Sequence, residues 1–248
     1  MAATTRTPRQ GSAQHVVEQG IIASSVTRLI QALVFLLLTL CFSILIEWLG
    51  MATGYWEQPG SQHSERMLAT ELSYLHRDFR RSAIVEQPAS FVRQFSDRFY
   101  ELSIQKTGIQ AAILWLSKPT TPSSQLRQHL QALYRGLEDY LTAALTVVRI
   151  FAVRLAVLAL AMPAFVLLAL LGLIDGLVQR DIRRWSGGRE SSFVYHWAKK
   201  AFYPSLILPW IIYLAIPESV HPNWVVLPFA VSFGISVRVM ASMFKKYL

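Results

Sequence analysis

Cysteine is almost absent from this sequence. Cys41 is the single cysteine among 248 residues, so no disulfide can form within the chain. Any folded region outside a membrane must therefore be stabilised by packing and polar contacts alone. A metal site built on paired cysteines is excluded for the same reason.

Catalytic and cofactor motifs are missing as well. The sequence has no Gly-rich loop ending in Lys-Ser or Lys-Thr, no His-Glu-x-x-His pair and no Gly-x-Ser-x-Gly elbow. Its six histidines are scattered without the spacing of metal ligands. We therefore expect a protein that is not an enzyme, with no catalytic residues, no cofactor and no metal.

Charge is scarce, and long apolar segments take its place. Charged residues make up 16% of the chain and hydrophobic residues 53%, which is too apolar for an ordinary soluble protein of this length. The longest uncharged run, from Leu155 to Ile174, matches the apolar thickness of a bilayer at about 1.5 Å per residue. The sequence predicts an integral membrane protein.

Four apolar segments predict an all-α fold with four transmembrane helices. A helical extracytoplasmic region is expected between the first two. The predicted organisation is an N-terminal tail, 1–28; transmembrane helix 1, 29–49; the extracytoplasmic region, 50–148; transmembrane helix 2, 149–174; a basic loop, 175–200; transmembrane helix 3, 201–216; a hairpin, 217–223; transmembrane helix 4, 224–243; and a C-terminal tail, 244–248.

Lys and Arg are distributed unevenly between these segments. The basic loop holds six of them, and the hairpin at 217–223 holds none. Short loops rich in Lys and Arg stay in the cytoplasm. The loop is therefore predicted to be cytoplasmic. Since each predicted transmembrane helix crosses the membrane once, both termini are then also cytoplasmic. Both terminal segments carry cations, as cytoplasmic segments do: Arg6, Arg9, Arg28, Arg238, Lys245 and Lys246.

Helical periodicity runs through the extracytoplasmic region. Leu68, Leu72, Leu75 and Phe79 fall on one helical face. After a Pro- and Thr-containing linker at 118–124, a leucine stripe continues without interruption into the second span. This pattern predicts one long helix that starts outside the membrane and passes through it. The apolar stretch 105–117 fits either packing within this region or the headgroup layer.

Two features of the second span suggest different neighbours. Ala152, Ala156 and Ala159 form a small-residue face, which is suited to close packing against another span or another subunit. A homo-oligomer is one assembly that this face allows. Arg149 and Arg154 are expected to be lipid-facing anchors that reach toward phosphates.

The basic loop contains a candidate contact surface. An apolar stripe that includes Trp185 alternates with arginines and predicts an interfacial helix. Two glycines then allow a turn. The residues expected to contact a partner are Arg183, Arg184, Trp185, Arg189 and Glu190.

From Leu170 to Lys200 the chain has, in order, a span, Asp-Gly, a basic helix, Gly-Gly-Arg-Glu-Ser, Tyr-His and another span. This order resembles the inner-membrane protein family encoded by integrating conjugative elements and related conjugative plasmids. The resemblance implies a bacterial inner-membrane component of a conjugative type IV secretion DNA-transfer apparatus, with the coupling-protein ATPase and other secretion subunits as partners.

Other partners and functions follow from the residues themselves. Anionic lipid is expected at the basic face, and direct nucleic-acid binding is not. The external region of about a hundred residues also suits an exclusion or envelope-protective protein that blocks a redundant incoming apparatus. A small-molecule transporter is a weaker alternative, based on the prolines of the third apolar segment.

Overall fold

The computed structural model describes residues 21–78, 88–117, 125–186 and 192–244, and these residues form helices joined by turns. The prediction of an all-α fold is confirmed for this part of the chain. The elements are α1, Ile21–Thr53; α2, Gln62–Asp78; α3, Pro88–Tyr100; the π-helical turn η1, Glu101–Gln105; α4, Ile109–Ser117; α5, Gln125–Ser186; α6, Ser192–Ala215; and α7, Pro222–Ser242.

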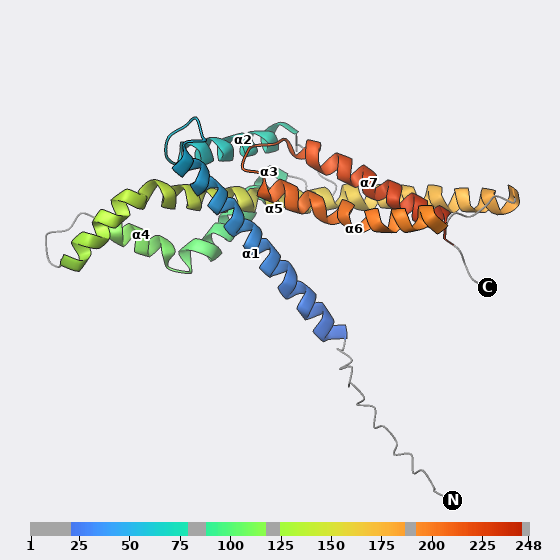
Figure 1. Cartoon of the computed structure of the whole chain (residues 1–248), viewed down its shortest axis with the longest axis horizontal. Coiled ribbons are helices and arrows are strands. Elements are labelled where there is room, and N and C mark those ends of the chain that lie inside the picture. The colour runs from blue at the N-terminus through green and yellow to red at the C-terminus, as the bar shows by residue number, and fades with distance from the viewer. Residues whose placement is uncertain (1–20, 79–87, 118–124, 187–191, 245–248) are drawn as a thin grey trace, which may run out of the picture. The chain divides into compact units, whose positions relative to one another are not determined.

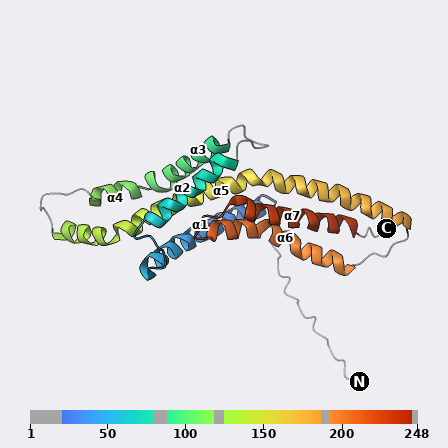
Figure 2. The same ribbon diagram turned by 90° about the horizontal axis from the view of Figure 1, so that it is seen from above.

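The chain divides into two units, residues 1–37 and 38–248. The described part of the first unit is the beginning of α1, where large apolar side chains such as Leu29 and Leu33 are exposed. In the second unit, α2, α3 and α4 pack against the N-terminal half of α5, and α7 packs along its C-terminal half (Figures 1 and 2).

A single helix of 62 residues, α5, organises the second unit. It contains both the leucine stripe after the linker and the uncharged run from Leu155 to Ile174, so the predicted continuous helix is confirmed. Among the leucines of the stripe, Leu137 is 50% exposed, and Leu141 and Leu145 are half-buried. The buried face of α5 instead includes Val147 and Phe151.

Three of the described helices are long and apolar enough to cross a membrane. They are Ser24–Thr53 in α1, Gly136–Ser186 in α5 and Pro222–Ser242 in α7. The prediction of a fourth transmembrane helix at 201–216 is wrong by this measure. That apolar segment extends only about 24 Å at about 1.5 Å per residue, against a hydrocarbon core of about 30 Å. The longer helix that contains it, α6, begins with polar residues that include Lys199 and Lys200.

The helices α5 and α7 run in the same direction and are packed closely. Arg154 contacts the loop before α7, and Arg183 contacts Ser242 at the end of α7. The intervening helix α6 returns the chain between these two ends and packs mainly on α7. The C-terminal end of α7 therefore lies beside the C-terminal end of α5 (Figure 2).

Glycine makes the close approach of α5 and α7 possible. A Cβ atom added to Gly172 would overlap the carbonyl oxygen of Gly234, and one added to Gly176 would overlap that of Arg238. A Cβ atom on Gly234 would lie 2.9 Å from the carbonyl oxygen of Leu168. Gly172 and Gly176 have the small-xxx-small spacing that lets helix backbones meet in membranes.

We predict that Gly172→Ala destabilises the protein by about 1 to 3 kcal/mol, the usual cost of overpacking a tight contact. Gly136→Ala is the matched control, because it places the same methyl group on the same helix where nothing lies within 4 Å. Thermal unfolding of the two purified variants in detergent compares these effects. Equal midpoints would show that the α5–α7 contact does not require glycine.

Candidate functional site

A buried ion pair joins α5, one of the three candidate membrane-crossing helices, to α2. Arg154 and Glu71 are each 1% exposed. The Nη2 and Nε atoms of Arg154 donate to Oε1 of Glu71 at 2.8 and 2.9 Å. Two charges are stable in such a place only when their attraction and further hydrogen bonds offset the loss of water.

Those further hydrogen bonds come from α6 and the loop after it. Nη1 of Arg154 donates to the carbonyl oxygens of Tyr213 at 3.1 Å and Ile216 at 2.5 Å, and Nη2 donates to that of Glu218 at 2.6 Å. The carbonyl groups at a helix end have no partner within the helix, so the guanidinium closes the end of α6. A single side chain thereby connects α2, α5, α6 and the loop before α7.

The second oxygen of the Glu71 carboxylate is also occupied. The Tyr213 hydroxyl donates to Oε2 of Glu71 at 2.9 Å. Tyr213 belongs to α6, outside the three candidate spans. Burial, and next the neighbouring Glu71 carboxylate, raise the pKa of the Tyr213 phenol well above its ordinary value. The phenol therefore stays protonated and remains a hydrogen-bond donor.

The interpretation of Arg154 as a lipid-facing anchor is wrong. Its stem does not extend to the surface, because Glu71 and the backbone carbonyl groups hold its head group inside the protein. Arg149, one and a half turns earlier, is exposed. Its guanidinium carbon lies 4.2 Å from the centroid of the Tyr100 ring, a cation–π contact.

A second buried acid, Glu47, lies at the end of α1 within the second unit. It is almost fully buried, and its Oε2 atom lies 3.0 Å from Nδ1 of His63. The His63 ring stacks on Trp56 with centroids 3.9 Å apart. The Trp56 indole in turn donates to the Glu47 carbonyl oxygen at 3.2 Å. These three side chains fold the connection between α1 and α2 back onto α1.

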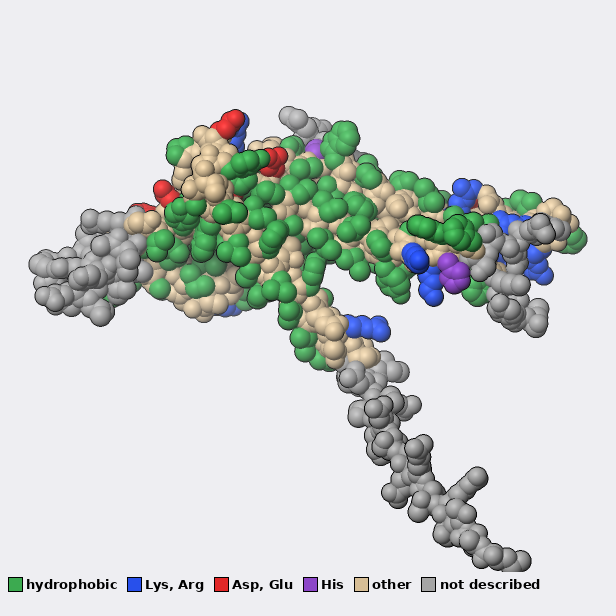
Figure 3. Space-filling model, viewed as in Figure 1, with side chains coloured by type: hydrophobic (Ala, Val, Ile, Leu, Met, Phe, Trp, Pro, Cys, Tyr) green, Lys and Arg blue, Asp and Glu red, His purple; other side chains and the backbone are tan. Residues whose placement is uncertain are grey.

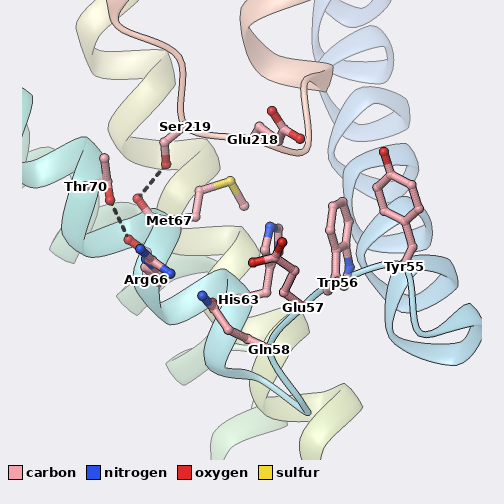
Figure 4. A pocket seen from close by; sticks show the side chains of 10 residues that line it. All are labelled: Tyr55, Trp56, Glu57, Gln58, His63, Arg66, Met67, Thr70, Glu218 and Ser219. Carbon is pink, nitrogen blue, oxygen red and sulfur yellow. Dashed lines mark hydrogen bonds between the residues drawn. The ribbon is translucent and has the colours of Figure 1, made fainter.

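A pocket of about 510 Å³ is lined by His63, which contacts Glu47, and by Met67 of α2 (Figure 4). It is formed by the α1–α2 connection, one face of α2 and the α6–α7 loop. Its polar lining includes acidic and basic groups, among them Glu57, Arg66 and Glu218. Met67 links it to the ion pair, since its sulfur accepts from Arg154 at 3.7 Å. Within the described residues, no three His, Cys, Asp or Glu side chains are grouped so as to hold a metal ion.

The proposed contact residues lie at the other end of α5. Arg183 is engaged inside the molecule, where its Nη1 atom donates to the Ser242 carbonyl oxygen at 3.1 Å and to the Met243 sulfur at 2.8 Å. Arg184 is exposed, and Trp185 is 92% exposed. Arg189 and Glu190 lie outside the described residues.

The three alanines predicted to form a packing face on α5 differ in burial. Ala152 and Ala156 are buried, and Ala159 is exposed. Near the C-terminal end of α5, an ion pair joins Asp175 to Arg238 of α7. This pair was not predicted from the sequence, although Gly172 and Gly176 on either side of Asp175 indicate close helix packing.

We predict that Arg154→Gln lowers the free energy of unfolding by about 3 to 5 kcal/mol, because it leaves the Glu71 carboxylate buried without its cation. Arg149→Gln removes the same charge from an exposed position on the same helix, and its effect should stay within about 1 kcal/mol. Thermal unfolding in detergent measures both. The double variant Arg154→Met with Glu71→Leu, which removes both charges, should recover part of the lost stability. Equal stability of Arg154→Gln and Arg149→Gln would contradict the role of the pair.

Comparison with known families gives one match. Residues 55–245, which hold both ion pairs and the pocket, match the model of a family described as DtrJ-like, IncC plasmid conjugative DNA transfer protein. No curated protein and no solved structure matches the chain.

Proposed function

The chain belongs to the DtrJ-like family of IncC plasmid conjugative DNA transfer proteins, and from this premise we propose that it is a non-enzymatic inner-membrane subunit of a conjugative type IV secretion apparatus. Family membership is the observation that carries the proposal, because it ties the chain to conjugative DNA transfer. The three helices long and apolar enough to cross a membrane support a membrane position. Contact with DNA itself is assigned to other subunits.

Charge supports one orientation in the membrane. The parallel packing of α5 and α7 brings the arginines at the end of α5 beside the end of α7. Lys and Arg side chains gather at this end, where α6 also begins (Figure 3). Because such clusters remain in the cytoplasm, we assign this end to the cytoplasm. The C-terminal tail follows the end of α7 that lies beside the end of α5, and the N-terminal tail carries its own cations, so both tails are assigned to the same side. In this arrangement α6 carries the chain back along α7 to the other end, which leaves both tails on one side although α6 is not one of the three candidate spans.

The exposed end of α5 is the proposed docking surface for the coupling-protein ATPase. Arg183 is already used in holding α7, so the contact is assigned to Arg184 and Trp185, together with Arg189 and Glu190. Tryptophan and arginine are enriched among the residues that dominate binding energy. The planar guanidinium of Arg also pairs with carboxylates in a way that Lys does not reproduce.

Reporter fusions that work on only one side of the membrane test the orientation. We predict cytoplasmic signals for fusions at the N-terminus, near Gly188 and after Leu248, and an external signal near Pro119, because the cations surround the first three positions. An external signal near Gly188 would remove the proposed docking surface from the ATPase.

Deletion of the gene from its conjugative element, followed by complementation in the donor, tests the function. We predict that deletion abolishes transfer and that the wild-type gene restores it. Complementation with Trp185→Ala should reduce transfer and weaken co-purification of the ATPase, by about 2 kcal/mol or thirtyfold if this side chain is a dominant contact. Wild-type transfer from the deletion donor would exclude an essential role in the apparatus.

Charge-preserving variants separate partner contact from attraction to lipid. Arg184→Lys and Glu190→Ala should both reduce co-purification and transfer, whereas the Arg184→Lys variant keeps the positive charge that attracts anionic lipid. Arg180→Lys is the control, since it makes the same exchange one turn earlier on α5. Normal co-purification with all the loop variants would leave this segment a membrane-surface anchor.

A further inference from the structure

A groove of about 480 Å³ lies between α6 and α7, away from the ion pair and pocket described above. On α6 it is lined by Val194, Trp197, Ala198 and Ala201, which share one helical face. On α7 it follows every third or fourth residue from Pro228 to Val239. Its lining is mainly apolar, with two serine side chains on α7.

The hydroxyl of Ser236 is already used inside the helix. Ser236 is buried and donates to the backbone carbonyl oxygen of Ser232 one turn earlier. Ala198 is buried beside it, and the large side chains of Trp197 and Ile235 form exposed walls. The groove therefore offers a narrow apolar channel open to the surroundings of the helices.

Cationic groups flank this channel where Trp197 lines it. The Lys200 ammonium lies 5.8 Å from the centroid of the Trp197 ring, and Trp197 lines the groove. Lys199 and Lys200 are both exposed. Arg238 precedes the last groove residue of α7 and pairs with Asp175, which marks the end of the uncharged run of α5. The lining residues themselves carry no charge, so these cations lie at the edge of the channel rather than inside it.

We propose that this groove binds one anionic phospholipid, with an acyl chain between α6 and α7 and its phosphate at Lys200. From Pro228 to Val239 the groove extends about 16 Å along α7 at about 1.5 Å per residue, close to half of a hydrocarbon core of about 30 Å. The acyl chain of a lipid in one leaflet is therefore long enough to fill the groove. Tryptophan favours the headgroup level, and a cation there attracts an anionic headgroup. The site is independent of the proposed ATPase contact.

Quenching of tryptophan fluorescence tests the site in the full-length protein, reconstituted into phosphatidylcholine vesicles. Phosphatidylglycerol with brominated acyl chains is the probe, and brominated phosphatidylcholine is the comparison. The difference between the wild type and Trp197→Phe isolates the Trp197 signal. We expect half-quenching at about fivefold lower mole fraction for the anionic probe, the factor that one cation supplies near an anionic lipid.

Two variants and two matched controls define the site. Lys200→Gln should remove most of the preference for the anionic probe, and Arg184→Gln, which removes one cation at the same end of the molecule, should preserve it. Ser232→Phe should block the groove and reduce quenching by both probes. Leu227→Phe adds similar bulk to an exposed position of α7 outside the groove, and should not. Ala201→Phe blocks the channel from α6 if Ser232→Phe does not fold.

Three results would overturn the proposal. Equal half-quenching by the two probes would mean that ordinary surrounding lipid contacts Trp197. An equal loss of preference in Lys200→Gln and Arg184→Gln would mean that only the general surface charge attracts the lipid. Protection of Trp197 from both probes, together with a cross-linked dimer, would mean that a second copy of the chain occupies the groove.

Discussion

Two ion pairs mark the ends of the uncharged run of α5, one of the three helices that are long and apolar enough to cross a membrane. Arg154 pairs with Glu71 of α2, and Asp175 pairs with Arg238 of α7. These two positions on α5 are about 31 Å apart at about 1.5 Å per residue, close to the thickness of a hydrocarbon core. Each charge at a boundary is thus neutralised by a different helix. The positions of α2 and α7 along α5 follow from this requirement.

The two ion pairs contribute differently to the stability of the structure. The pair of Asp175 and Arg238 is about half exposed, so water or headgroups screen it and its contribution to stability is small. Close packing of glycines supplies the contact between α5 and α7 at that end. The pair of Arg154 and Glu71 is buried, and it binds the end of α6 through backbone carbonyl groups. It therefore orders the pocket formed by α2 and the α6–α7 loop.

The sequence was sufficient for the features that depend on local pattern. Hydrophobic runs and periodicity identified helices that are long and apolar enough to cross a membrane, and the continuous helix α5. The role of Arg154 was misjudged because its partners lie 59 or more positions away along the chain, and three of its contacts are to backbone atoms that have no sequence signature. Similarly, the pattern around Arg183 shows an amphipathic helix, but not that Ser242 and Met243 lie beside it. The prediction of a fourth transmembrane helix was wrong because the apolar segment 201–216 is shorter than a bilayer crossing.

The unbroken length of α5 has a mechanical consequence. A helix of 62 residues extends about 93 Å, about three times the hydrocarbon thickness. Under the proposed orientation, its first turns lie well outside the membrane and Trp185 lies inside the cell. No loop interrupts this helix, although Pro163 within it lacks the N–H of one backbone hydrogen bond. A rotation about the helix axis, or a displacement along it, at one end is therefore transmitted to the other end.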